Sequence, residues 1–271
     1  MDAELLEKMG AVEERHWWFR AKREIITTLL WRYLSLHGKP HPGRPREPRS
    51  KTRADCGVSA STAHARRPRV ADLGCGCGAL LTRLAADFDA VGMDSSAVAV
   101  EFSSRTGAKV VAGRLPDEVP LESGSFDAVV LADVLEHIED DRAALAAAGE
   151  LLRTGGVTVV TVPAQPRLWS GWDEAHGHRR RYTQRSLAAL FEGAGLEAEL
   201  VSYFNTLLFP AAAAARLLEI RGLRRRTADL EVPPGAINEI LYRIFAAERH
   251  LLGRVRLPVG LSLAAVLKRK P

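Results

Sequence analysis

The amino-acid sequence predicts an α/β fold in which a seven-stranded, mostly parallel sheet carries helices on both faces. From residue 69 onward, short apolar runs alternate with amphipathic helical stretches, which is typical of a parallel sheet covered on both sides. A turn with glycine at every second position, residues 74–78, joins the first apolar run to the first helical stretch. The chain has 271 residues, 46% of them hydrophobic, which is enough for one domain with elaborations.

Seven runs have the length, composition and flanking turn residues of strands. They are Val70–Leu73, Ala90–Met93, Lys109–Ala112, Asp127–Ala132, Val157–Val162, Leu196–Tyr203 and Leu261–Leu267. Four helical stretches lie between them, namely Ala79–Ala86, Ser96–Arg105, Asp141–Leu152 and Gln184–Ala194. We expect the last helix to be capped by Thr183 and closed by Gly195.

Two helical parts lie outside this alternation. Apolar residues recur at near-helical spacing from Ala11 to Leu36, which predicts one long amphipathic cap helix. Before the final strand, the apolar segments Leu207–Ile220 and Ile237–Leu252 predict a helical insertion. The predicted organisation is therefore an N-terminal helical cap at 1–36, a linker at 37–68, a core at 69–205, the insertion at 206–256, and the last strand with a tail at 257–271.

The basic residues are concentrated in the linker. It is rich in Pro, Arg, Ser and Gly without periodicity, so we predict that it is disordered. Residues 37–69 hold nine Lys or Arg and two acids, whereas the whole chain has a net charge of +5. The rest of the chain is therefore slightly acidic, which disfavours nucleic acid as a partner of the globular part.

The sequence predicts a cytoplasmic protein. No apolar run reaches the about 18–20 residues that cross a bilayer, and residues 1–4, M-D-A-E, do not begin a secretory signal. Three cysteines provide no disulfide framework. Cys75 and Cys77 have no Cys/His pair at ligand spacing, so no metal site is expected.

The glycine turn and the next strand end predict a cofactor site. Asp72 lies two residues before Gly74, where it can accept hydrogen bonds from a cationic or hydroxyl-bearing ligand. The pattern Gly74-x-Gly76-x-x-Ala79 also satisfies the dinucleotide fingerprint that places pyrophosphate at a helix N-terminus. Asp94, at the tip of the second strand, can bind both hydroxyls of a ribose. These residues alone leave the choice of cofactor open.

Two downstream motifs decide between the cofactors. Residues 125–137 read S-F-D-A-V-V-L-A-D-V-L-E-H, and residues 151–156 read L-L-R-T-G-G before a predicted strand. With the glycine turn and Asp94, these motifs resemble the ordered motifs of class I S-adenosylmethionine (SAM)-dependent methyltransferases over about 90 residues. Dehydrogenases lack the segment at 125–137. The resemblance implies a Rossmann-like fold and SAM as cofactor. It departs from the family at Gly113, followed by Arg114 instead of the frequent Asp, and at Thr154, which replaces the usual Pro.

The resemblance also implies which residues bind SAM. Asp72 would orient the methionyl amino end, Asp94 would hold the ribose, and Leu115 would border the adenine. The complete predicted set is Asp72, Gly74, Cys75, Gly76, Gly78, Asp94, Ser95, Leu115, Asp133 and Val134.

The acceptor is expected beyond the carboxyl end of the fifth strand, where ligands lie in open parallel sheets. Residues 163–182 are dense in Trp, His and Arg, and residues 16–19 read H-W-W-F. The pairing of H-W-W-F with W-x-x-x-D-E-x-x-x-H-x-R-R-Y resembles a bacterial subgroup of class I methyltransferases. The predicted acceptor-binding residues are Trp17, Trp18, Trp169, Asp173, His176, Arg180, Arg181 and Tyr182. The alternatives are that the two N-terminal tryptophans face the core and that the arginines pair with neighbouring acids.

A hydroxyl acceptor benefits from a base with a pKa near neutrality. The candidates are His178 first, then His16 and His137, each with a purely structural hydrogen bond as the alternative. The predicted reaction is transfer of a methyl group from SAM to a small molecule, as O-methylation of an apolar, natural-product or lipid-like intermediate. The alternatives are a nucleic-acid methyltransferase and a non-catalytic SAM-binding protein.

The apolar insertion is expected to do one of three things. It could cover the acceptor, form a homodimer face, or contact a membrane surface together with Arg221 and Arg224–Arg226. Covering the acceptor is the favoured interpretation.

Overall fold

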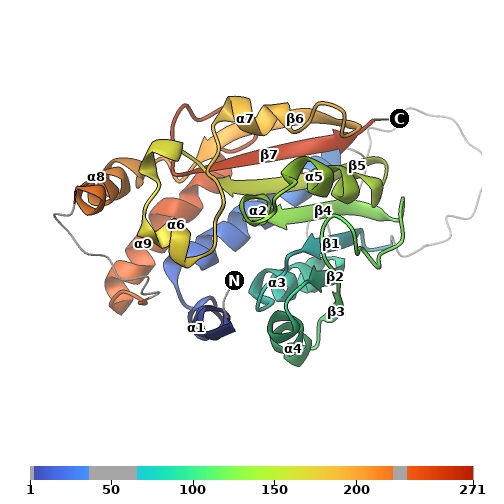
Figure 1. Ribbon diagram of the computed structural model, residues 1–271, viewed down its shortest axis with the longest axis horizontal. Coiled ribbons are helices and arrows are strands. Elements are labelled where there is room, and N and C mark those ends of the chain that lie inside the picture. Colours follow the sequence, from blue (N-terminus) through green and yellow to red (C-terminus); the bar gives the residue numbers. More distant parts are fainter. Residues whose placement is uncertain (1–2, 37–65, 222–230, 271) are drawn as a thin grey trace, which may run out of the picture.

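The computed structural model describes residues 3–36, 66–221 and 231–270 (Figure 1). The prediction of a disordered linker falls mostly on residues outside these ranges, and so does the predicted membrane contact of Arg224–Arg226.

A seven-stranded sheet forms the centre of the molecule, with strand order β3-β2-β1-β4-β5-β7-β6. The strands from β1 to β5 pair in parallel, while β7 runs antiparallel to β5 and β6. This confirms the predicted fold class. The strands are β1 (Arg69–Leu73), β2 (Asp89–Asp94), β3 (Lys109–Ala112), β4 (Phe126–Ala132), β5 (Leu152–Pro163), β6 (Leu196–Phe204) and β7 (Ser262–Arg269).

Helices cover both faces of the sheet (Figure 1). Alternate strand residues point to opposite faces, so Val70 and Val130 pack in one core cluster and Ala71 and Val129 in the other. The helices between the strands are α3 (Ala79–Asp87), α4 (Ala97–Arg105), α5 (Asp141–Glu150) and α7 (Gln184–Ala189). The predicted helix Asp141–Leu152 is too long by two residues, because Leu152 pairs with Phe126 and begins β5.

The N-terminal cap consists of two helices, α1 (Ala3–Val12) and α2 (Trp17–Leu36). The prediction of one helix from Ala11 to Leu36 is wrong. Asn238 explains part of the break, since its amide accepts a hydrogen bond from Trp17 N at 2.9 Å and donates one to Arg15 O at 2.9 Å. A side chain from the other end of the chain thus fixes the turn between the two helices.

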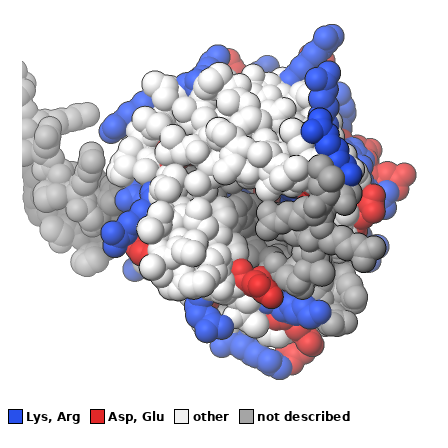
Figure 2. Space-filling model, turned by 90° about the vertical axis from the view of Figure 1, so that its left-hand side faces the viewer, with Lys and Arg blue, Asp and Glu red and all other residues white. Residues whose placement is uncertain are grey.

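The insertion contains α8 (Phe209–Ile220) and α9 (Gly235–Ala247), followed by a 3-10 turn, Glu248–His250. Helix α9 packs against α2, where Phe245 meets Trp17. Helix α8 buries none of its residues, and its end of the molecule is largely uncharged where Figure 2 leaves it in view. The exposed apolar residues there are Leu207, Leu217, Leu218, Ile220, Ile237, Ile240 and Ile244. Among the described helices, none combines the length and the hydropathy of a membrane span.

Candidate functional site

The glycine turn lies at the carboxyl end of β1 and is fixed to β2. The N–H groups of Gly74 and Cys75 both donate to Met93 O, at 2.7 and 3.1 Å. Gly74 has a φ of 73°, and a Cβ there would lie 2.6 Å from a methyl of Val134. Gly76 has a φ of 54°, but a Cβ there would meet nothing within 4 Å. The turn therefore packs on the end of β4 at Gly74 and is open at Gly76.

Two predicted carboxylates flank this turn. Asp94 accepts from Gly76 N and Ser96 N, each at 2.9 Å, one bond on each carboxylate oxygen. Asp72 is buried, and neither of its oxygens has a hydrogen-bond partner in the described structure. Burial first, and then the charges of Asp94 and Glu13, raise the pKa of Asp72 to about 7. A buried acid without a partner at a strand end is suited to bind a cationic ligand.

Glu13 is a third acid at the turn, and the sequence analysis missed it. Its carboxylate accepts from Ala79 N at 3.1 Å, at the first residue of α3. Burial raises the pKa of Glu13 to about 7. Helix α1 lies on the turn, because Cys77 Sγ donates to Leu6 O at 3.2 Å. No local motif marks Glu13, because its partner is 66 residues away.

Lys22 of α2 connects the cap to the end of β4. It forms an ion pair with Asp133, whose other oxygen accepts from Thr161 Oγ1 at 2.9 Å. Burial opposes ionisation of Asp133, but Lys22 and Thr161 outweigh it and hold the pKa of Asp133 below its ordinary value. The Lys22 ammonium also lies 4.7 Å from the centre of the Trp18 ring. The structure therefore places Trp18 beside the site, whereas Trp17 packs on Phe245.

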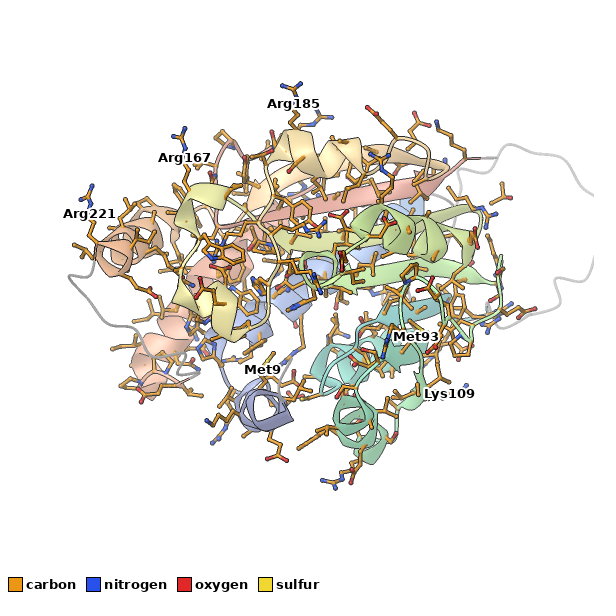
Figure 3. The ribbon with its side chains drawn as sticks, viewed as in Figure 1. Met9, Met93, Lys109, Arg167, Arg185 and Arg221 are labelled. Atoms are coloured by element: carbon orange, nitrogen blue, oxygen red, sulfur yellow. The ribbon has the colours of Figure 1, made fainter. Side chains whose placement is uncertain are left out.

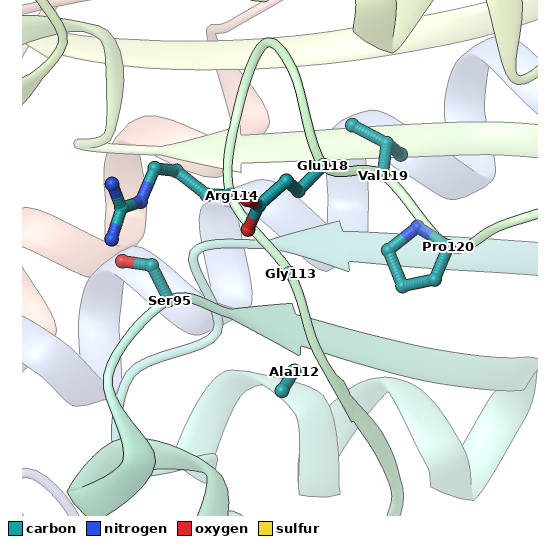
Figure 4. A pocket seen from close by; sticks show the side chains of 7 residues that line it. All are labelled: Ser95, Ala112, Gly113, Arg114, Glu118, Val119 and Pro120. Atoms are coloured by element: carbon teal, nitrogen blue, oxygen red, sulfur yellow. The ribbon is translucent and has the colours of Figure 1, made fainter.

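A pocket of about 450 Å³ lies at the ends of β2 and β3 (Figure 4). It is lined by Ser95, Ala112, Gly113, Arg114, Glu118, Val119 and Pro120. Figure 4 shows Arg114 and Ser95 at one end of this pocket and Pro120 at the other. Glu118 supplies a carboxylate to the lining that the sequence analysis did not identify. Leu115, predicted to border the adenine, is instead buried in a core cluster with Met93 and is not among the lining residues.

Two of the three candidate histidines meet beyond β4 and β5. The rings of His137 and His178 are 4.9 Å apart and nearly perpendicular, at 82°. His178 Nδ1 lies 2.9 Å from a carboxylate oxygen of Asp173, and His137 Nδ1 lies 3.3 Å from Gly177 O. Burial, and then the neighbouring His178, lower the pKa of His137 to about 4. Burial also opposes ionisation of Asp173, but hydrogen bonds from His178 and Arg181 outweigh it and lower the pKa of Asp173 to about 2.

The third candidate, His16, lies at the start of α2. Its Nδ1 accepts from Trp18 N at 3.2 Å, and its ring packs near Trp17 and Phe19. His176 stacks on Trp172 with ring centres 3.8 Å apart, and Trp169 Nε1 donates to Glu174 at 3.3 Å. These contacts stabilise the local turns. The acceptor roles of Trp169 and His176 stay predictions.

The polar residues at the end of the loop attach it to the body of the protein. Arg180 pairs with Asp141 at 2.8 Å, and Tyr182 Oη donates to the same carboxylate at 2.7 Å. Arg181 pairs with the buried Asp173 at 2.8 Å. These three residues and Asp173 thus hold the histidines in place, and their acceptor contacts stay predictions. By contrast, Arg167, Arg185 and Arg221 point outward (Figure 3).

Comparisons with known proteins agree with this architecture. A family model described as a methyltransferase domain matches residues 46–201. A solved SAM-dependent methyltransferase from Thermotoga maritima superposes with a TM-score of 0.50 at 18% identity, covering 75% of this chain and 82% of that one. A chain of the complex between the Haloferax volcanii Trm112 methyltransferase activator and a methyltransferase gives 0.52 at 20% identity, covering 76% and 84%. At these identities the structures show the fold alone.

Curated relatives match part of the chain. A 37.1 kDa protein in transposon TN4556 of Streptomyces fradiae is 31% identical over 176 residues, which is 58% of this chain and 50% of that protein. The ubiquinone biosynthesis O-methyltransferase of Xanthomonas axonopodis pv. citri is 32% identical over 154 residues, which is 49% of this chain and 64% of that enzyme. The matches span about half to just under two thirds of the length of these relatives.

Proposed function

Because the chain belongs to the methyltransferase domain family, we propose that it is an enzyme that transfers a methyl group from SAM to a hydroxyl of an apolar small molecule. The family and the fold imply SAM as the methyl donor. The observation that carries the proposal is the buried Asp72 carboxylate, which has no hydrogen-bond partner in the described structure and lies beside an open glycine turn.

The residues at the turn fit SAM better than a dinucleotide. SAM carries a sulfonium and an ammonium, and Asp72, Asp94 and Glu13 surround the turn with carboxylates. A dinucleotide places its negative pyrophosphate at the helix N-terminus. Here the carboxylate of Glu13 already binds Ala79 N at that position. The acidic surroundings therefore favour the cationic cofactor.

Each part of the cofactor has residues suited to it. Asp72 would hold the amino group, and Asp94 would accept from the ribose hydroxyls while it keeps its two backbone bonds. The pocket beside Ser95 would take the adenine, with Glu118 as an acceptor for its amino group. When bound, SAM supplies an electrophilic methyl group, and the protein aligns the acceptor with it.

The histidine pair is the part of the site suited to act on a hydroxyl. Asp173 accepts from Nδ1–H of His178, so Nε2 of His178 carries the lone pair that can act on the acceptor. Arg181 and Ser170 N hold Asp173 in turn, at 2.8 and 3.0 Å. Trp18 and Lys22 would close the acceptor site from the cap side.

The helical insertion supports an apolar acceptor. Arg216 of α8 donates to Ser170 Oγ and lies 5.3 Å from the centre of the Trp172 ring. The apolar helix α8 is thus attached to the loop that carries His178. The name of one relative, an O-methyltransferase of ubiquinone biosynthesis, supports a hydroxyl acceptor of this kind.

The alternative that the apolar face forms a homodimer is checked by sedimentation at several protein concentrations.

A transfer assay tests the proposal. The purified protein is incubated with SAM and with pairs of acceptors that share one hydroxyl and differ in an alkyl tail, and S-adenosylhomocysteine is measured. We expect turnover with the lipophilic member of each pair and none in an Asp94→Ala variant. Turnover with amines or polar hydroxyls alone would contradict the proposed acceptor. SAM binding without turnover on any acceptor would support the non-catalytic alternative.

A further inference from the structure

Glu136, His137 and His178 form a cluster of metal-ligating groups. One ligand-type atom from each residue lies within 4.8 Å of the other two. Glu136 is fully buried, and neither of its carboxylate oxygens has a hydrogen-bond partner in the part of the chain that the structure describes. Leaving a buried carboxylate unsatisfied is costly. A cation would offset this cost.

Both histidines are oriented in the manner of metal ligands. A carbonyl oxygen only accepts hydrogen bonds, so His137 Nδ1 must donate to Gly177 O. A carboxylate also accepts, so His178 Nδ1 carries the proton that it donates to Asp173. Each ring therefore carries its free lone pair on Nε2. Metal-bound histidines typically donate their other ring N–H to a carboxylate or a backbone carbonyl, and here one histidine uses each kind of acceptor.

The backbone holds the three residues together. Glu136 and His137 lie in the 3-10 turn after β4, Leu135–His137, and His178 lies in the loop after β5. Arg179 N donates to Glu136 O at 2.8 Å, and Arg179 Nε donates to His137 O at 3.2 Å. Ligands from two loops are thus fixed against each other, and metal–ligand bonds of about 2.0–2.2 Å would bring the three ligand atoms closer together than the 4.8 Å within which they now lie.

We propose that Glu136, His137 and His178 bind a divalent metal ion of the zinc class, and that this ion binds the acceptor hydroxyl. Two imidazoles and one carboxylate suit Zn²⁺ and leave a coordination position open. A hydroxyl bound there loses its proton to solvent more readily, because the ion stabilises the alkoxide or phenolate. With the metal bound, the Nε2 lone pair of His178 is a metal ligand, so the ion takes over from that nitrogen the activation of the hydroxyl. The oxygen–carbon bond then forms as the sulfur–methyl bond breaks, and S-adenosylhomocysteine leaves. The role of the ion in activating the hydroxyl rests on the proposed function, whereas metal binding does not.

A titration without SAM or acceptor tests the site. The full chain, with affinity tags removed and metal stripped by chelation, is titrated with Zn²⁺ by calorimetry and with Co²⁺ by visible absorption. We expect one ion per chain and a metal-dependent rise in melting temperature. Glu136→Gln and His178→Asn should each weaken Zn²⁺ binding at least about tenfold. Asp173→Asn, which removes the carboxylate that orients His178 and pairs with Arg181, should weaken it about tenfold. Glu136→Gln replaces a buried, unpartnered acid, so it should not lower the melting temperature of the metal-free protein.

The matched control is His176→Asn, in the same loop but outside the triad, which should keep the stoichiometry and affinity of the wild type. The site is overturned if the wild type binds no Zn²⁺, or if Glu136→Gln and His178→Asn bind it as tightly as His176→Asn does. Should His178→Asn fail to fold, Glu136→Asp, which keeps the charge on a shorter side chain, must still alter the Co²⁺ spectrum. SAM binding by the wild type is measured separately. If the wild type binds Zn²⁺ but not SAM, the proposed function is overturned and the metal site is retained. If the wild type turns over acceptors with SAM but binds no Zn²⁺, the metal site is overturned and the proposed function is retained.

Discussion

Asp72 is a residue whose proposed role in binding conflicts with the stability of the ligand-free protein. Its carboxyl group is fully buried at the end of β1 without a hydrogen-bond partner in the described structure, and its pKa is raised to about 7. An acid whose pKa is raised in the folded state favours folding at low pH and opposes it as pH rises through the folded pKa. The metal-free and cofactor-free protein should therefore carry a cost at this residue in mildly alkaline solution.

Replacing Asp72 with Asn separates stability from binding. The substitution removes the buried charge, so we expect the free energy of unfolding of the cofactor-free protein to rise by about 1–3 kcal/mol at pH 8, with a smaller gain at pH 5. The same variant should lose SAM affinity by about tenfold or more, because it cannot balance the ammonium. Urea denaturation at the two pH values and calorimetry with SAM check this prediction. A variant that is destabilised at pH 8 would contradict it.

The pH dependence of SAM binding follows from the same residue. A cation beside Asp72 favours its ionised form, so protons leave when SAM binds. In the wild type we expect the affinity for SAM to fall as pH drops below about 7, with further loss as Glu13 takes up a proton over the same range. Calorimetry between pH 8 and pH 6 measures the affinity for SAM. A dissociation constant that does not change over this range would contradict the proposed contact between Asp72 and the cofactor.

Gly74 shows a steric requirement at single-residue scale. Gly74→Ala would place a Cβ 2.6 Å from Val134 at a φ of 73°, and we expect it to cost about 2–4 kcal/mol of stability. Gly107→Ala is the control, since Gly107 has a φ of 80° but a Cβ there would meet nothing within 4 Å, so it should cost only the backbone strain of about 1 kcal/mol. Denaturant unfolding compares the two. Equal losses would show that Val134 does not constrain the turn.

At the scale of elements, the strands were predictable and the cap was not. Buried parallel strands are continuous apolar runs bounded by turn residues, so residues such as Val129 and Val130 marked β4 directly. The break between α1 and α2 depends on Asn238, which is 221 residues from Trp17. No local periodicity contains that information. The same reason explains why Glu13 was missed at the turn.

The candidate site, too, was predictable only where its residues lie in local sequence motifs. Motifs local in sequence identified Asp72, Asp94 and the glycine turn, whereas tertiary contacts decided the rest. The sequence analysis expected no metal site because it searched for paired ligands at short spacing, and His178 lies 41 residues beyond His137. The arginines that were expected to bind the acceptor were found to pair with Asp141 and Asp173, close to the predicted alternative.

The turn between α1 and α2 gives a prediction for the cap as an element. Glu13→Ala would remove the carboxylate at the N-terminus of α3. The loss of this negative charge should lower SAM affinity about fivefold. The backbone N–H groups at the start of α3 would then be exposed, and ADP binding should become detectable. Glu14→Ala is the matched control, because Glu14 is the next residue and forms an exposed ion pair with Arg23. Calorimetry with both ligands checks this prediction. An effect of Glu14→Ala as large as that of Glu13→Ala would refute it.

The whole molecule joins three parts around one edge of the sheet. The core supplies Asp72 and Asp94, which we propose bind the cofactor. The cap contributes Glu13 and Lys22, and the insertion attaches α8 to the loop of His178 through Arg216. The central claim is that this edge binds SAM and not a dinucleotide.

Calorimetric titration of the wild type with SAM and with NAD at pH 8 tests that claim most directly. We include Asp94→Ala, and Asp89→Ala as the control at the exposed opposite end of β2. We expect one SAM per chain, no measurable NAD binding, and at least about tenfold weaker SAM binding in Asp94→Ala alone. That variant would lose the proposed ribose hydrogen bonds and the bonds to Gly76 N and Ser96 N. Tighter binding of NAD than of SAM, or SAM binding that Asp94→Ala leaves unchanged, would contradict it.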